Sequence, residues 1–212
     1  MNRSRVLRSL LGPGAFAGAA LAAARMEPDY RHRDEPVSAL AARGGRGAKV
    51  MVPGFLGLAA GTLALAADLR GSDVAPDPVP AMLGVAGLCT AGAGLARNSD
   101  RSCPSRLLGD DHYTPSDDAH AAFALVTFSL WVATPLVAAA RARRASGRYR
   151  AWSRRLGLFC FTAMVLDGVL ARRGGDRFGG AAQRLTLAGV LGWYPLAAAM
   201  AGGAERQPPA GA

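Results

Sequence analysis

The sequence is poor in the residues that usually mark a metal centre or a disulfide framework. It has only three cysteines and three histidines. No two cysteines have the short spacing of metal ligands, and no two histidines have the H-x-x-x-H spacing that puts both on one helix face. We therefore expect no metal site, no cofactor and no structural disulfide.

Lysine is almost absent as well, since Lys49 is the only one in the chain. Arginine carries the rest of the positive charge and gives a formal net charge of +10. The arginines lie in short segments beside apolar runs, and no basic stripe interleaved with aromatic residues is present. The sequence therefore argues against a nucleic-acid partner, and its arginine and alanine bias is typical of a GC-rich genome.

Charge is missing, or reduced to one residue, in six long apolar stretches, whereas a soluble amphipathic helix mixes apolar and charged residues in every turn. A helix that crosses a bilayer needs about 17–25 mainly apolar residues. We predict an all-α polytopic transmembrane bundle in the cell membrane, with the lipid bilayer as its main partner. Its six spans are expected at about residues 6–26, 50–67, 78–96, 118–140, 155–172 and 185–203, followed by a disordered tail at 205–212.

The first apolar stretch has a second interpretation. Arg3, Arg5 and Arg8 form a basic segment before it, and Ala22-Ala23-Ala24 resembles the small-residue cleavage site of a signal peptide. The stretch is long for the apolar part of a signal peptide, which favours a retained first span.

Orientation depends on the basic residues of the short connections. The segment Arg141–Arg155 holds seven arginines and no acid, so it is expected to stay in the cytoplasm. This predicts a bundle with both termini inside. The connections Arg25–Lys49, Arg97–Ala119 and Arg172–Arg184 then lie outside, and they contain most of the polar residues that could form a site.

Small residues recur inside the first two spans as Gly14-x-x-x-Gly18 and Gly57-x-x-x-Gly61. This spacing lets helix backbones approach closely in lipid. It also arises by chance in a chain so rich in glycine and alanine, and the sequence alone leaves both explanations open.

The clearest polar motif is Thr114-Pro115-Ser116-Asp117-Asp118-Ala119-His120. Thr114 with Asp117 fits a helix cap, and the two acids suit a helix N-terminus. His120 lies deeper, at the membrane edge, where an imidazole needs a polar partner. We expect His120 to face the bundle interior and to contact a carboxylate or hydroxyl of another segment, with the Asp34–Ser38 stretch as the best candidate.

Two sets of candidate site residues follow from these positions. Ser38 can be a nucleophile or simply a cap, Asp167 can face the bundle or pair with Arg172 or Arg173, and Gln183 with Arg184 can anchor the chain at the interface. Trp193 can line a cavity or pack. The hypothetical catalytic set is His120, Asp117, Asp118, Ser38 and Asp167, and the hypothetical substrate-binding set is Asp34, Glu35, Gln183, Arg184 and Trp193.

The order of these features resembles the bacterial membrane family catalogued as domain of unknown function 998, common in actinobacteria. The resemblance runs from about Tyr30 to Ala201. It rests on Tyr30 with Pro36-Val37-Ser38-Ala39-Leu40, Gly54-Phe55-Leu56, Asp117-Asp118-Ala119-His120, and Gln183-Arg184 with Trp193. Gly12-Pro13-Gly14, which would interrupt the first span, departs from the family pattern. The resemblance implies six membrane helices and no particular reaction.

Three function classes remain on this basis. The first is a bundle that handles a lipid or small apolar molecule, with a polar site on the outer face. The second is an intramembrane enzyme, of hydrolase or acid–base cyclase type, acting on a lipid or isoprenoid-like substrate. A transporter is third, because only Gly12-Pro13-Gly14 suggests a broken helix.

Overall fold

The computed structural model describes residues 3–72, 74–103, 106, 109, 111–143, 145–172 and 178–204. In this part of the chain every long regular element is an α-helix. The helices are α1 Arg3–Met26, α2 Ala48–Leu69, α3 Val79–Leu95, α4 Pro115–Arg141, α5 Gly147–Arg172 and α6 Gly179–Ala204. A short 3-10 helix, η1 Val37–Ala41, lies between α1 and α2. The predicted all-α bundle is confirmed.

Each expected span coincides with one of these helices, and the largest difference is at α5. This helix begins at Gly147, well before the apolar run that starts at Leu156. Arginine is a good helix former, and Tyr149 and Ser153 already form a buried face between the arginines of the first turns. The helix therefore extends beyond its uncharged part. The expected tail lies outside the described residues.

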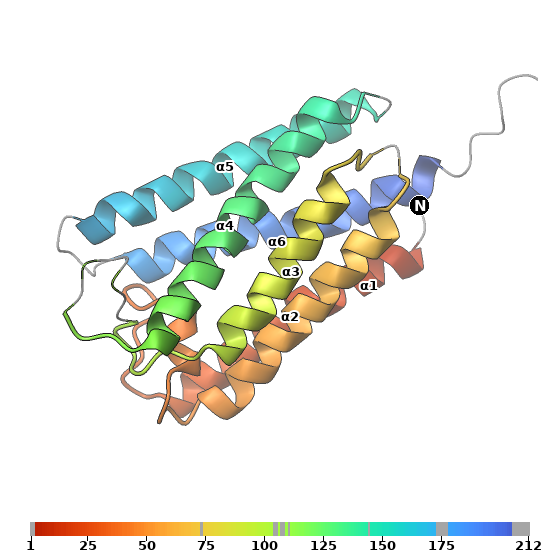
Figure 1. Cartoon of the computed structure of the whole chain (residues 1–212). Coiled ribbons are helices and arrows are strands. Elements are labelled where there is room, and N and C mark those ends of the chain that lie inside the picture. Colours follow the sequence, from red (N-terminus) through yellow and green to blue (C-terminus); the bar gives the residue numbers. More distant parts are fainter. Residues whose placement is uncertain are drawn as a thin grey trace, which may run out of the picture.

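The helices form a closed bundle in which neighbours along the chain pack together (Figure 1). The first and last helices also contact each other, and α6 reaches α2 and α4 besides α1 and α5. Because α6 touches so many partners, it lies closest to the bundle interior. The N-terminus of α1 and the C-terminal end of α6 lie at the same end of the bundle (Figure 1).

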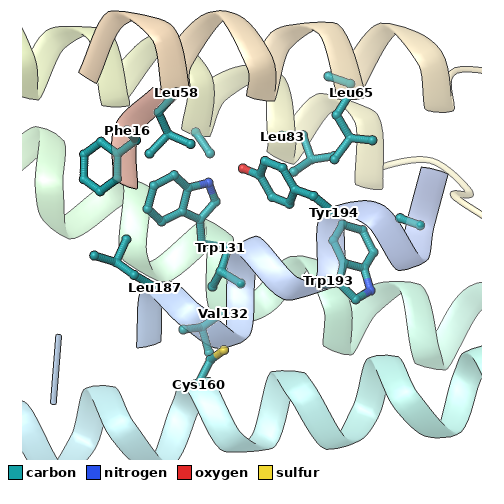
Figure 2. Packing of buried hydrophobic residues seen from close by; sticks show 14 of the residues in the cluster. Phe16, Leu58, Leu65, Leu83, Trp131, Val132, Cys160, Leu187, Trp193 and Tyr194 are labelled. Atoms are coloured by element: carbon teal, nitrogen blue, oxygen red, sulfur yellow. The ribbon is translucent and has the colours of Figure 1, made fainter. Parts of the chain in front are cut away.

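Trp193 and Tyr194 of α6 are both packed in this interior. The Trp193 indole donates a hydrogen bond to Ser153 Oγ at 2.9 Å, and the Tyr194 hydroxyl lies 2.8 Å from Thr62 Oγ1. Figure 2 shows Tyr194 with its hydroxyl turned toward Trp131. These aromatic residues therefore hold α6 against α5, α2 and α4.

Close contact between α1 and α2 depends on one of the two predicted glycine pairs. A Cβ at Gly61 would lie 2.7 Å from Gly12 Cα, and a Cβ at Gly57 would lie 3.3 Å from the Ala15 side chain. By contrast, nothing lies within 4 Å of a Cβ placed at Gly14 or Gly18. The second pair is thus a packing motif, and the first faces outward.

The helix α1 is continuous through Pro13. Proline removes one backbone donor, and a membrane helix tolerates this loss where neighbouring helices, hydroxyl side chains or local adjustments satisfy the freed carbonyl. The adjacent Gly12 sits directly against α2, which supports the helix at this point. The expectation that Gly12-Pro13-Gly14 interrupts the first span is wrong, and the only sequence feature that suggested a transporter disappears with it.

The outer surface of the bundle is apolar. Each of the six helices exposes large apolar side chains, among them Leu11, Leu56, Leu88, Leu125, Leu158 and Leu185. By length and composition, α1, α2 and α4 can cross a membrane, and α3 is a shorter apolar helix. Since an apolar surface this widespread is unfavourable in water, the chain is a helical membrane protein.

Candidate functional site

Three connections expected on the same side of the membrane meet at one end of the bundle, which we call the polar end. It comprises residues 27–42, residues 96–103 and the first turns of α4 and α6. The Arg43 amide donates to the Asn98 carbonyl at 2.8 Å, and the Gly180 amide donates to the Asp34 carbonyl at 3.1 Å. The polar end is therefore a folded layer whose backbone is joined across segments.

The segment 27–42 covers the bundle instead of forming an open loop. Val37, Ala39, Leu40 and Ala41 of η1 are buried. The Gln183 side-chain oxygen accepts a hydrogen bond from the Val37 amide at 2.7 Å, which fastens η1 to α6. Consequently Gln183 has a structural role in placing the segment that closes this end.

Glu35 and Arg101 form the principal ion pair of the polar end. Arg101 Nε and Nη2 lie 3.0 and 2.7 Å from Glu35 Oε2, and the Arg31 amide adds a hydrogen bond of 2.9 Å. The side chains are 31% and 23% exposed, so solvent screens the pair only partly. The Glu35 carboxylate is therefore already paired within the protein.

Arg184 of α6 binds neutral oxygen atoms. It donates to the Tyr30 hydroxyl and to the backbone oxygens of His32, Glu35 and Gly180. Among the described residues no carboxylate forms an ion pair with it, so its charge is not cancelled locally. Burial is the main cause that raises the pKa of Tyr30, while the Arg184 charge opposes that rise.

Asp34 lies at the start of α6. Its carboxylate accepts from Arg33 Nε at 2.8 Å and from the Phe178 amide at 3.3 Å. The hydrogen bond from Arg33 is the main reason that the pKa of Asp34 is lowered. Asp34 therefore acts as an anchor for the N-terminal turn of α6.

Asp117 completes the predicted helix cap and also binds the preceding loop. The capping box between Thr114 and Asp117 is present. The Asp117 carboxylate further accepts from the Ser99 amide at 2.6 Å and from Ser99 Oγ at 2.8 Å. Its neighbour Asp118 accepts from the Arg106 amide at 2.9 Å. Both acids are engaged in holding the loop before α4.

A small cavity, which we call the central cavity, lies directly beneath the polar end. Its volume is about 40 Å³, enough for about two or three water molecules. Among the described residues, side chains from every helix except α5 line it, and none of these side chains is charged. The members with polar side-chain atoms are Ser38, Thr90, His120, Thr127, Trp131 and Gln183, and the apolar members include Phe16, Phe55, Leu58, Phe128 and Leu187.

His120 faces this cavity and is buried, as expected. Its Nδ1 lies 2.7 Å from the Ala93 carbonyl oxygen and 2.9 Å from that of Ala96. Since carbonyls only accept, Nδ1 carries the proton and Nε2 is an acceptor. The expected carboxylate or hydroxyl partner from another segment is not what Nδ1 binds, because the last carbonyls of α3 lack helix donors and lie within its reach.

Ser38 lines the same cavity, with its Oγ 3.6 Å from Cys103 Sγ. Burial is the main cause that raises the pKa of Cys103 to about 11. Asn98 Nδ2 donates to the same sulfur at 3.1 Å. No hydrogen bond joins Ser38 to His120 in the described structure, so a serine–histidine nucleophile pair is not assembled here.

Thr127 leaves a buried polar atom without a partner in this cavity. Its side chain is 4% exposed, and its hydroxyl has no hydrogen bond among the described residues. Trp131, one turn further along α4, lies between Phe16, Leu58 and Leu187 with its indole nitrogen turned toward the Tyr194 hydroxyl (Figure 2). Thr127 Oγ1 and Trp131 Nε1 are thus the two buried side-chain atoms at this cavity that have no hydrogen-bond partner among the described residues.

A larger hollow lies between α1 and α6, and we call it the α1–α6 groove. Its volume is about 310 Å³. His32 and Arg184 line the groove where it reaches the polar end of the bundle. Apolar side chains line the rest, namely Phe16, Ala17, Ala20, Leu21, Leu40, Leu187, Ala188 and Leu191. Phe16 and Leu187 line both the groove and the central cavity, so they form the wall between the two spaces.

A family model described as Protein of unknown function (DUF998) matches residues 10–200, which include most of every helix. The chain belongs to this family. No curated protein and no solved structure matches the chain. In this DUF998 protein, the residues that suggested the resemblance lie in contact across segments, for example Tyr30 with Arg184 and Val37 with Gln183.

The remaining predicted site residues lie elsewhere. Trp193 is in the core beside Ser153 and lines neither space. Asp167 lies near the start of α6, where a Cβ at Gly179 would be 3.4 Å from its Oδ1. The side chain of Arg172 and all of Arg173, its suggested partners, are outside the description. The structure therefore brings Ser38, His120 and Gln183 together at the cavity and leaves the acids outside it.

Sequence reasoning overlooked Arg101, Cys103 and Thr127 at this site. Arg101 and Cys103 lie in a loop with no recognisable motif, so nothing in the sequence connected them to Glu35 or Ser38. Thr127 did carry a signal, because it lies two turns after His120 and must share its helix face. A hydroxyl on the buried face of a membrane span is a feature to examine whenever a histidine precedes it.

Proposed function

We propose that this DUF998 protein crosses the cell membrane six times, with both termini in the cytoplasm, and binds a single-chain lipid with an anionic head group. The chain lies in the α1–α6 groove, and the head group binds beside Arg184 at the outer face. The observation that carries this proposal is an apolar groove of about 310 Å³ that ends at a cation. Binding an amphiphile requires both features, an apolar groove for the chain and a charged group for the head group.

The groove suits an apolar chain because small residues of both helices create it. Ala17 and Ala20 of α1 face Ala188 of α6, where longer side chains would fill the space. Ala17 and Ala188 are exposed, so the groove opens on the apolar surface of the bundle. Its volume lies at the lower end of the range of ligand pockets, about 300–1,000 Å³.

Charge complementarity favours an anionic head group. Arg184 is held in place by the hydroxyl of Tyr30 and by backbone oxygens, which orient the guanidinium without neutralising it. The nearby carboxylates of Glu35 and Asp34 are engaged by Arg101 and Arg33. A phosphate or carboxylate at the groove end therefore gains a charge-assisted contact at a cation that is already ordered.

The test uses dodecyl phosphate and, as a probe of equal chain length and opposite charge, dodecyltrimethylammonium, both added to the protein in maltoside micelles. Binding is measured as a saturable rise of the thermal midpoint. We expect dodecyl phosphate to bind about tenfold more tightly than the ammonium probe. Equal binding of both probes, or no saturable binding of the phosphate, contradicts the anionic head group.

The matched variants are Ala188→Trp, which fills the groove, and Ala122→Trp on the exposed face of α4. The first should abolish the shift given by dodecyl phosphate, and the second should leave it unchanged. If both variants bind the phosphate as the unmodified protein does, the ligand does not lie between α1 and α6.

A further inference from the structure

The central cavity is lined by polar atoms that have no role in the proposed binding of a lipid in the α1–α6 groove. Val37 and Ser38 of η1 line it above, its described lining side chains are uncharged, and the Thr127 hydroxyl and the Trp131 indole nitrogen have no hydrogen-bond partner there. Burying a hydroxyl away from water without a hydrogen bond is unfavourable, and such groups in native proteins usually bind an ordered molecule. A further atom, His120 Nε2, is left as an acceptor because Nδ1 donates to the end of α3.

We propose that the central cavity is a binding site for an uncharged hydroxyl group. A hydroxyl both donates and accepts, so it can be the partner of the Thr127 hydroxyl, and further hydroxyl groups can extend the hydrogen-bonded chain toward the acceptor on His120. A charged group does not fit, because no ionised side chain lines the cavity and burying an unpaired charge is much more costly. The volume of about 40 Å³ admits the polar end of a ligand but not a whole lipid.

Two sources supply this chemistry. The first is a short chain of water molecules, since the volume and the polar lining meet the requirements for buried water. The second is the hydroxyl end of a long-chain alcohol whose chain occupies the α1–α6 groove. Phe16 and Leu187 form the shared wall, so a shift of these side chains joins the two spaces. Only this second source rests on the proposed function.

The decisive variant is Thr127→Val, which removes the hydroxyl while keeping the branched shape. Thr134→Val is the matched control on the same helix, because Thr134 is equally buried but its hydroxyl already donates to the Leu130 carbonyl at 2.6 Å. Thr127→Ser restores the hydroxyl. Thermal midpoints are measured in maltoside micelles without additive, and then in a titration with decanol.

If a hydroxyl occupies the cavity, Thr127→Val lowers the thermal midpoint more than Thr134→Val does, and Thr127→Ser restores it. If the source is water, decanol acts equally on the Val variant and on the unmodified protein. If the source is an alcohol, Thr127→Val weakens decanol binding about fivefold, the amount expected from one lost hydrogen bond. A thermal midpoint that rises or stays the same in Thr127→Val, with unchanged decanol binding, shows that the hydroxyl has no partner and overturns the proposal.

The groove variant separates this inference from the proposed function. Ala188→Trp should abolish binding of dodecyl phosphate whether or not the central cavity holds a hydroxyl. Conversely, Thr127→Val should leave dodecyl phosphate binding unchanged, because Thr127 does not line the groove. If Ala188→Trp still binds dodecyl phosphate, only the proposal for the groove is contradicted. If Thr127→Val does not show its expected effect on the thermal midpoint or on decanol binding, only the proposal for the central cavity is contradicted.

Discussion

The imidazole of His120 forms the C-terminal cap of α3, with its Nδ1 2.7 Å from the Ala93 carbonyl oxygen. The amide that would normally bind this carbonyl belongs to Arg97, which instead donates to the Leu95 oxygen. His120 thus supplies the missing donor at the end of a neighbouring helix. This contact fixes the ring orientation and directs the other nitrogen away from α3.

The His120 cap predicts a specific loss of stability. His120→Leu removes the donor and leaves the carbonyls of Ala93 and Ala96 unsatisfied, which should cost about 1–3 kcal/mol. His120→Asn keeps an N–H donor and should recover part of that loss. Unfolding measured in mixed micelles tests this, with exposed His112→Leu as the control. A Leu variant as stable as the unmodified protein contradicts the capping role.

The sequence was sufficient to predict the helices because membrane spans are marked by the absence of charge over a fixed length. It was also sufficient to place His120 in the interior. It did not identify the partner of His120, because that partner is a backbone oxygen, and every residue carries one. It likewise missed the pairing of Arg101 with Glu35, since a contact between two distant loops leaves no periodic signal.

The glycine contact between α1 and α2 gives a second prediction. Gly61→Ala places a Cβ 2.7 Å from Gly12 Cα, and this overpacking should destabilise the bundle by about 1–3 kcal/mol. Gly18→Ala is the matched control, because nothing lies within 4 Å of its Cβ. The control should be neutral or gain up to about 1 kcal/mol from helix propensity. Equal effects of the two variants would show that the backbones do not meet there.

Cys103 should react slowly with iodoacetamide at neutral pH. The thiolate is the reactive form, and burial raises the pKa of Cys103 from 9.0 to about 11. In a Cys89→Ala, Cys160→Ala background, the alkylation rate of the folded protein should reach half of its maximum near pH 11. The unfolded chain should reach half of its maximum about two pH units lower. Because the folded protein favours the neutral Cys103 thiol, the contribution of Cys103 to the free energy of unfolding is fully present below pH 9. This contribution is lost as the pH rises from 9 toward 11. Identical profiles for folded and unfolded protein contradict this burial.

The proposed six-span arrangement predicts that the two ends of the bundle are labelled from opposite sides of the membrane. In a background with all three native cysteines replaced by alanine, a cysteine at Arg148 should react only from the cytoplasmic side. A cysteine at Ser105 should react only from outside. Each is measured with an impermeant maleimide on intact cells and on inverted vesicles. Reaction of both positions from one side excludes the topology.

The central claim, that a lipid chain lies between α1 and α6, is tested most directly by photocrosslinking. A single-chain phosphate lipid with a diazirine near the chain end is irradiated with the protein in micelles, and the adducts are located by peptide mass spectrometry. We predict adducts concentrated on groove residues such as Leu21, Ala188 and Leu191, reduced by excess dodecyl phosphate and absent from those positions in Ala188→Trp. Adducts spread evenly over exposed residues of α4 and α5 such as Leu125 and Leu158, and unchanged by competitor, would contradict the account.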